Sequence, residues 1–165
     1  MEVRYKLMEH ERVEDAPFVG CLISAISCKR KCKGCFNQHL KDLPTIKREA
    51  EDIIKEVAEN PFDEGIILAG LEWRHQEQEA IELAYWAWVY GLKTMLYTGY
   101  EYPAKWILCG YFDYVKVGSY KEELKTDDHY EYGVKLASSN QCIICLTPVN
   151  EFWRRSVYGH KYRSF

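Results

Sequence analysis

Residues 18–40 read FVGCLISAISCKRKCKGCFNQHL, an apolar run that leads directly into three closely spaced cysteines. The run over 18–26 has the length and the aliphatic content of a strand buried on both faces. Cys28, Cys32 and Cys35 follow it, with three and then two residues between them. Thiolates are the usual protein ligands of iron–sulfur clusters, and such short spacings let one loop surround one cluster. The stretch therefore predicts a strand whose end carries a metal-binding loop.

Short apolar runs and helical patterns alternate along the rest of the chain. A helix is expected over 45–59, where Pro44 and Thr45 suit the start, and another over 75–90, closed by Gly91. Further segments complete the pattern: strands over 65–69, 93–97, 113–117 and 142–147, and a short helix over 103–108.

Strands that alternate with helices imply an α/β fold with a mostly parallel sheet, whose ligands bind at the carboxyl ends of the strands. The chain has 165 residues, whereas a closed barrel of eight such units takes roughly 250. We therefore expect a single domain over 1–165, folded as a partial, open β/α barrel. The basic segment 151–165 is expected to be a loosely ordered tail, with docking on a partner as the alternative.

Composition excludes several classes of partner. The chain is 47% hydrophobic and 28% charged, with a formal net charge of -3, so nothing draws it towards nucleic acid or an anionic membrane. No apolar run approaches the ~18 residues that a spanning helix needs, and the polar start MEVRYKLMEHER does not resemble a signal peptide. We expect a cytoplasmic protein with no nucleic-acid or membrane partner.

The chain has seven cysteines, an odd number that argues against a disulfide framework and for metal or redox chemistry. Cys142 and Cys145 have a metal-pair spacing, but residues three apart on a strand point to opposite faces. They are therefore expected to be two buried thiols. Cys21 and Cys109 are expected to pack in the core as small hydrophobes.

Three cysteines rather than four leave one iron of a 4Fe–4S cubane open to an outside ligand. S-adenosylmethionine can fill that position through its amino and carboxylate groups, and an electron from the cluster can then break its S–C5′ bond. The cations Lys29, Arg30, Lys31 and Lys33 are expected to lower the thiol pKa values and favour thiolates, or else to be a solvated basic loop.

Zinc is the main competitor, because His39 follows Cys35 by four positions and could complete a tetrahedral site with the three cysteines. Known structural zinc sites pair their ligands across a longer gap, which this segment lacks. The cysteines could also share one face of a helix, although Gly34 and the interleaved charges oppose a buried helix there.

These motifs resemble the radical S-adenosylmethionine superfamily, and more narrowly the activating proteins of anaerobic (class III) ribonucleotide reductase. The resemblance covers most of the chain. It rests on the cysteine loop with Gly34, Phe36 and Asn37, and on the motifs AGLE at 69–72, YTGY at 97–100, DYVKVGSYKEEL at 113–124 and SSNQ at 138–141.

The resemblance implies roles for particular residues. Gly70, Leu71 and Glu72 would contact the amino group of bound S-adenosylmethionine, and Phe36 and Asn37, after Gly34, would flank its adenosyl group. Leu71 stands where that family has glycine, and Trp73 where it has proline. Glu72 could instead be a surface carboxylate, and Phe36 could be core packing.

The implied activity is radical transfer to a protein. The 5′-deoxyadenosyl radical would remove a hydrogen atom from one glycine of the large reductase subunit, with a low-potential electron donor as a second partner. The alternatives are another glycyl-radical activase, a radical enzyme acting on a small molecule, or a non-catalytic zinc or iron–sulfur module.

Overall fold

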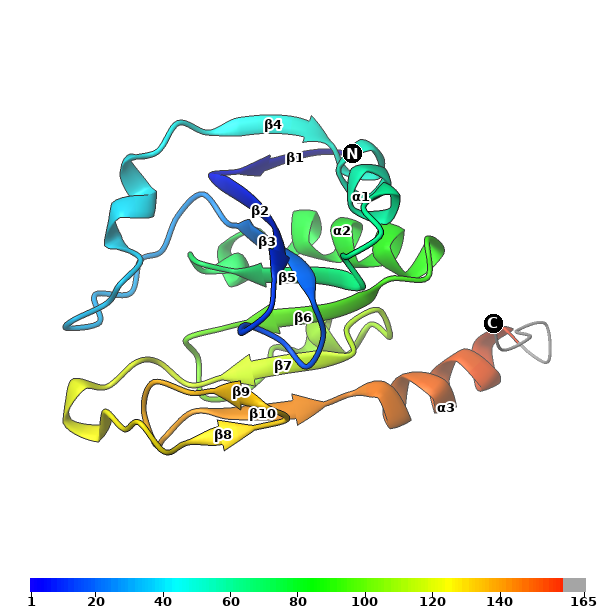
Figure 1. Cartoon of the computed structure of the whole chain (residues 1–165). Coiled ribbons are helices and arrows are strands. Elements are labelled where there is room, and N and C mark those ends of the chain that lie inside the picture. Colours follow the sequence, from blue (N-terminus) through cyan, green and yellow to red (C-terminus); the bar gives the residue numbers. More distant parts are fainter. Residues whose placement is uncertain (159–165) are drawn as a thin grey trace.

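The centre of the fold is a six-stranded sheet in the order β10-β7-β6-β5-β3-β2, seen in the computed structural model of Figure 1. The structure describes residues 1–158, with side chains described up to residue 152. The neighbours β3, β5, β6 and β7 run parallel, while β2 and β10 pair antiparallel at the two edges. The strands are β2 Leu7–Arg12, β3 Gly20–Ser24, β5 Gly65–Ala69, β6 Lys93–Tyr97, β7 Tyr114–Val117 and β10 Cys142–Cys145.

This arrangement confirms a mixed α/β fold with a largely parallel central sheet, and the partial barrel stays a prediction. Every residue of β3 and β5 is buried, as the uninterrupted apolar runs predicted. The last strand, β10, was expected to continue to residue 147 but ends at Cys145. It also departs from the parallel pattern, because it pairs antiparallel with β7.

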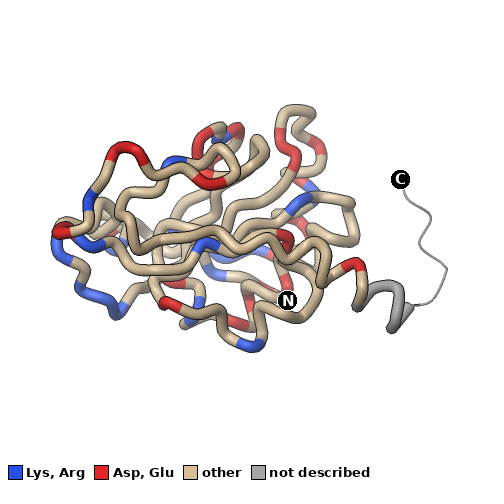
Figure 2. The backbone as a smooth tube through the Cα atoms, turned by 90° about the horizontal axis from the view of Figure 1, so that it is seen from below, with Lys and Arg blue, Asp and Glu red and all other residues tan. Residues whose placement is uncertain are grey.

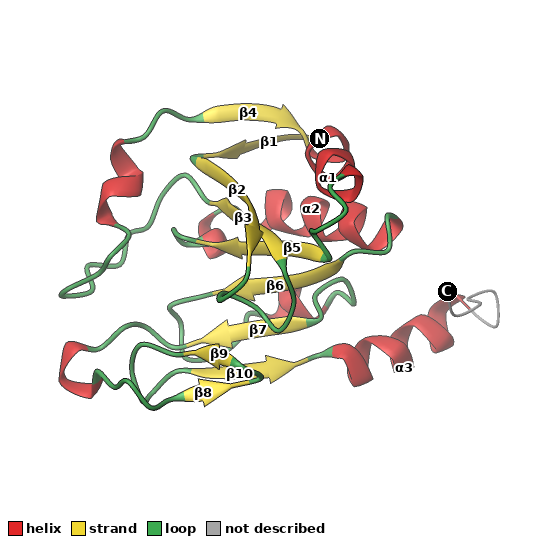
Figure 3. Cartoon of the chain, in the orientation of Figure 1, coloured by secondary structure: helices red, strands yellow, loops and turns green. Residues whose placement is uncertain are grey.

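Different elements cover the two faces of the sheet (Figure 3). Helices α1 (Ala50–Glu59) and α2 (Glu77–Val89) pack on one face and form the larger apolar core with residues such as Ile23, Ile66 and Leu68. The hairpin of β8 (Tyr130–Glu131) and β9 (Val134–Lys135) contributes to a smaller core on the other face. The central strands are thus shielded on both sides, which leaves their ends for a site.

The expected helix over 45–59 is wrong in its first turn. Strand β4 (Ile46–Glu49) precedes α1 and pairs antiparallel with β1 (Glu2–Tyr5), an element that the sequence pattern did not reveal. The backbone of β1 needs hydrogen-bond partners, and this pairing supplies them while its alternate residues Val3 and Tyr5 enter the core. Tertiary pairing thus overrides the local helical pattern.

The remaining segments are short or terminal. Residues 151–158, part of the expected loose tail, continue helix α3 (Thr147–Tyr158), which extends away from the sheet in Figure 1. The basic side chains Arg154, Arg155, Lys161 and Arg163 lie outside the described residues, so docking by this segment stays a prediction. Within the described chain, no helix is both long and apolar enough to cross a membrane. Four 3-10 turns complete the fold: Gln38–Asp42, Trp73–His75, Lys105–Leu108 and Glu122–Leu124.

Candidate metal centre

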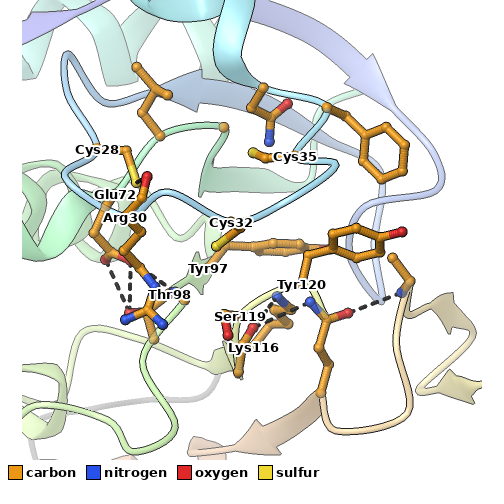
Figure 4. Close-up of a pocket in the computed structure, with 18 of the residues that line it drawn as sticks. Cys28, Arg30, Cys32, Cys35, Glu72, Tyr97, Thr98, Lys116, Ser119 and Tyr120 are labelled. Carbon is orange, nitrogen blue, oxygen red and sulfur yellow. Dashed lines mark hydrogen bonds between the residues drawn. The ribbon is translucent and has the colours of Figure 1, made fainter. Parts of the chain in front are cut away.

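The carboxyl ends of the four parallel strands meet around one cavity of about 320 Å³. Its wall combines the cysteine loop after β3, the loop at Gly70 after β5, Thr98 and Gly99 after β6, and Gly118 after β7. Parallel strands place their carboxyl ends at one edge of a sheet, so segments far apart in sequence converge there. Figure 4 shows the labelled side chains of this wall gathered around the same space.

Cys28, Cys32 and Cys35 are half-buried and line the cavity. The backbone N–H of Cys35 donates to the carbonyl of Cys32 at 3.2 Å, which closes a tight turn. Gly34 occupies that turn with φ +74°, and a Cβ there would lie 2.6 Å from Oε2 of Glu122. A side chain at this position would therefore be strained twice, by backbone conformation and by contact.

The electrostatics of Cys28 differ from the sequence expectation. Burial raises the pKa of its thiol above the ordinary value, and the nearby cation Lys41 offsets this only in part. The basic loop that carries the cysteines lies at one end of the molecule, and Figure 2 marks its Lys and Arg positions. A bound metal would add positive charge that favours the thiolate at Cys28.

The three thiols fit a multinuclear cluster better than a single zinc ion. Ligands of one zinc ion crowd together, but among the described residues these three sulfur atoms do not form a group that one ion could join. His39 is exposed, is not part of the cavity wall, and its Nδ1 lies 2.9 Å from the carbonyl of Phe36. The alternative of a zinc site completed by His39 is therefore not supported.

Glu72 is a firmly held polar group of the cavity wall. It is only 4% exposed, so the alternative of a surface carboxylate is wrong. Its carboxylate accepts hydrogen bonds from the hydroxyl of Thr98 at 3.0 Å, the N–H of Gly99 at 2.8 Å and the N–H of Arg74 at 3.0 Å. Glu72 therefore ties the loop after β5 to the end of β6 and holds a negative charge at the cavity.

Leu71 and Trp73 do not distort this loop. Gly70 has φ +80°. Among the described non-glycine residues, only Glu11 and Tyr132 have a positive φ, so the backbone of Leu71 is not strained in this way. Leu71 is buried in the core. Trp73 is fully buried, and its indole N–H donates to the carbonyl of Ile23 at 3.1 Å. The larger side chains therefore fasten the loop to β3.

A family model described as a 4Fe-4S single cluster domain matches residues 18–144, from just before β3 to within β10. The match contains the cysteine loop and all the strands whose ends form the cavity. The chain belongs to this 4Fe-4S single cluster domain family. No curated protein matches the chain. A 4Fe–4S cluster is therefore its cofactor, and Cys28, Cys32 and Cys35 are its candidate ligands.

The other four cysteines of this 4Fe–4S domain all lie in the described part of the chain, and none lines the cavity. Cys21 is buried, as expected. Cys109 is exposed in the loop after Lys105–Leu108, so its expected place in the core is wrong. Cys142 and Cys145 are half-buried rather than buried, because β10 is an edge strand. The cluster loop thus has three cysteines at its cavity and no fourth.

Phe36 and Asn37 of the 4Fe–4S domain both reach the cavity wall. Phe36 is 66% exposed, so the alternative of core packing is wrong. Its ring packs instead on Tyr120, with the ring centroids 5.5 Å apart. The two ring planes are tilted by 50°, so each ring by itself offers a face on which a planar group can stack.

Two cations of the cavity wall are Lys116, which the sequence analysis did not single out, and Arg30, which it did. Lys116 on β7 is 8% exposed, and its Nζ donates to the carbonyl of Gly118 at 2.8 Å. Burial lowers the pKa of Lys116 to about 8, with the nearby Glu72 acting in the opposite direction. The available signal was a lysine within an apolar strand. Arg30 brings a second cation, whose guanidinium carbon lies 4.8 Å from the centre of the Tyr100 ring.

Proposed function

We propose that this 4Fe–4S domain cleaves S-adenosylmethionine reductively and uses the resulting radical to generate a glycyl radical on the large subunit of anaerobic ribonucleotide reductase. One observation carries the first half of the proposal. The cluster loop places three cysteines at the cavity, no fourth cysteine joins them, and the cavity continues beyond them between the strand ends. A three-cysteine cluster leaves one iron for an outside ligand, and the adjoining space can hold the rest of that ligand.

The chemistry comes from the cofactors: one electron from the cluster splits the S–C5′ bond, releasing methionine and a 5′-deoxyadenosyl radical that takes a hydrogen atom from the substrate. The protein would hold and orient the reactants. Lys116 and Arg30 provide cations for the carboxylate of the methionine moiety, and Glu72 provides the complementary charge for its ammonium group. Phe36 and Tyr120 offer a stacking surface for the adenine ring.

Charge balance within the cavity supports a zwitterionic ligand. The Nζ of Lys116 donates to the neutral Gly118 carbonyl, and Glu72 is the nearby carboxylate that acts on its charge. A carboxylate-bearing ligand would give this buried cation a direct ion pair as well. Glu72 already has three donors, and an ammonium group nearby would add a charge-assisted contact.

The protein substrate rests on the resemblance of the sequence to reductase activating proteins. A protein substrate that docks over the cavity can itself exclude water from the radical, which is consistent with an activase. The partial β/α barrel and the low-potential electron donor belong to the same proposal.

The first test is anaerobic reconstitution with iron and sulfide, followed by reduction and EPR before and after S-adenosylmethionine is added. We expect an S = ½ cluster signal that changes on addition, together with formation of 5′-deoxyadenosine. The variant Cys32→Ala should lose both, while the matched variant Cys142→Ala, outside the cavity, should keep both. A cluster EPR signal that does not change when S-adenosylmethionine is added would instead indicate an electron-carrier module.

The second test adds the large subunit of an anaerobic ribonucleotide reductase to the reduced protein. A glycyl-radical doublet in the EPR spectrum, dependent on S-adenosylmethionine, is the expected result. Formation of 5′-deoxyadenosine without that doublet would refute this substrate. The remaining alternatives would then be another glycyl-radical activase or a radical enzyme for a small molecule.

A further inference from the structure

A second cluster of potential metal ligands lies at the opposite end of β3 from the cysteine loop. His10 of β2, Cys21 of β3 and Asp63, in the turn after α1, each offer one ligand atom, and these atoms lie within 4.8 Å of one another. It is the one group of its kind among the described residues. The donors are a nitrogen, a sulfur and an oxygen, a mixture that suits a borderline metal such as zinc.

The carboxylate of Asp63 is held in a fixed orientation. Its side chain is fully buried, and Oδ1 accepts a hydrogen bond from the backbone N–H of Glu11 at 2.8 Å. Glu11 adopts φ 60°, in the left-handed region, where the register between β2 and β3 shifts. A non-glycine residue in that region is strained, and such strain often accompanies a functional site. The strained bulge leaves Oδ2 of Asp63 facing His10.

His10 is oriented from its far side. Its Nε2 lies 3.2 Å from Oε1 of Glu56, and Oε2 of Glu56 pairs with Arg48 at 2.7 Å. The other ring nitrogen, Nδ1, hydrogen-bonds to Oδ2 of Asp63. A metal ion bound between these two groups would replace the proton of that hydrogen bond, while Glu56 would continue to orient the ring through Nε2.

The charges also fit a divalent ion. Cys21 is fully buried, and the one hydrogen bond that its thiol donates is a long contact of 4.0 Å to the carbonyl of Leu22. A thiolate from Cys21 and the carboxylate of Asp63 together balance a charge of two, while Glu56 and Arg48 neutralise each other. The His10 side chain is 29% exposed, so the site is open to solvent on that side for metal entry and for a water ligand.

We infer that His10, Cys21 and Asp63 bind a single Zn²⁺ ion, separate from the 4Fe–4S cluster. The ion joins the edge strand β2 to β3 and to the turn after α1, at the end of the sheet away from the cavity. Its role is structural, because it fastens a bulged edge strand to the core. This site goes beyond the proposed function and does not depend on cleavage of S-adenosylmethionine.

The test uses the holoprotein and an element-specific method, so that iron does not interfere. The reconstituted protein is incubated with equimolar Zn²⁺ and desalted, its metals are counted by mass spectrometry, and its zinc K-edge X-ray absorption is recorded. We expect about one zinc per chain, with one sulfur neighbour at about 2.3 Å and nitrogen or oxygen neighbours at about 2.0–2.2 Å.

Matched variants locate the ion. Cys21→Ser should remove the sulfur neighbour and lower the zinc content at least severalfold. His10→Gln, which changes a partly exposed side chain outside the buried core, should also lower the zinc content. Cys142→Ser, which changes a half-buried thiol elsewhere, should retain zinc and its sulfur neighbour. Zinc removed by the desalting step, or a sulfur signal that survives Cys21→Ser, would overturn the inference. Three sulfur neighbours would place the zinc in the cysteine loop and overturn it as well.

Discussion

Replacement of Gly70 by alanine tests the close approach that positions the cavity wall. Gly70 has φ +80°, and a Cβ added there would lie 2.6 Å from Oγ of Ser24 and 3.0 Å from Cδ1 of Leu40. Both neighbours are buried, and Ser24 ends the strand that leads into the cysteine loop. Gly91 provides a matched control, because it has φ +73° but no atom within 4 Å of an added Cβ.

The two substitutions share one cost and differ in another. Holding alanine in the left-handed region costs about 1–2 kcal/mol at either position. Overpacking a well-packed interior adds about 1–3 kcal/mol, and this cost applies to Gly70→Ala alone. The lower entropy of the unfolded chain offsets about 0.4–1 kcal/mol in both variants. Gly70→Ala should therefore lower the free energy of unfolding by about 1–3 kcal/mol more than Gly91→Ala.

Urea unfolding of the reduced, cluster-free protein, followed by circular dichroism, measures this difference. Iron bound per chain after anaerobic reconstitution is the second readout. Because Ser24 must move, Gly70→Ala should also lower iron uptake, whereas Gly91→Ala should leave it unchanged. Equal destabilisation of the two variants, within about 0.5 kcal/mol, would refute the close approach as the reason for glycine at this position.

Three further predictions concern the same end of the sheet. Trp73→Phe removes the buried hydrogen bond to the Ile23 carbonyl and should lower the free energy of unfolding, measured in urea, by about 1–3 kcal/mol; no change would contradict that anchoring role. Burial lowers the pKa of Lys116 to about 8 from the ordinary 10.5, so between these pH values the unfolded chain binds more protons than the folded one. In the cluster-free protein, the free energy of unfolding should rise over this pH range by roughly 3 kcal/mol relative to Lys116→Met. The same pH dependence in both proteins would refute the lowered pKa of Lys116. His39→Ala should retain full iron content by mass spectrometry, whereas Cys35→Ala should lose the cluster; iron loss in His39→Ala would make that histidine a ligand.

The elements that the sequence predicted best are those defined by local pattern. The apolar run ahead of the cysteines forms β3, and the helix expected over 75–90 is α2, with Gly91 in the left-handed conformation at its end. These signals act between residues a few positions apart. The strand β4 was missed because its partner β1 lies more than forty positions away, with Glu2 opposite Glu49. No local pattern encodes that pairing.

For the candidate site too, local features were predicted from the sequence and long-range contacts were not. The spacing of Cys28, Cys32 and Cys35 indicated a cluster loop without reference to the rest of the chain, and the family match supports the cluster. The state of Glu72 was left open between a ligand contact and a surface carboxylate. Its carboxylate is satisfied by donors directly after β6, which the parallel pairing of β5 with β6 brings within reach.

The sequence by itself thus favoured an iron–sulfur cluster over zinc and determined the alternation of strands and helices. Short-range spacing controls how one loop surrounds a cluster and how one segment buries its apolar face. The tertiary structure determined which side chains are buried and which of them lie close together. It buried Lys116 in the cavity wall, exposed Cys109, and brought His10, Cys21 and Asp63 together from three elements. Such contacts depend on strand order and register, which arise when the whole sheet assembles and which no single segment specifies.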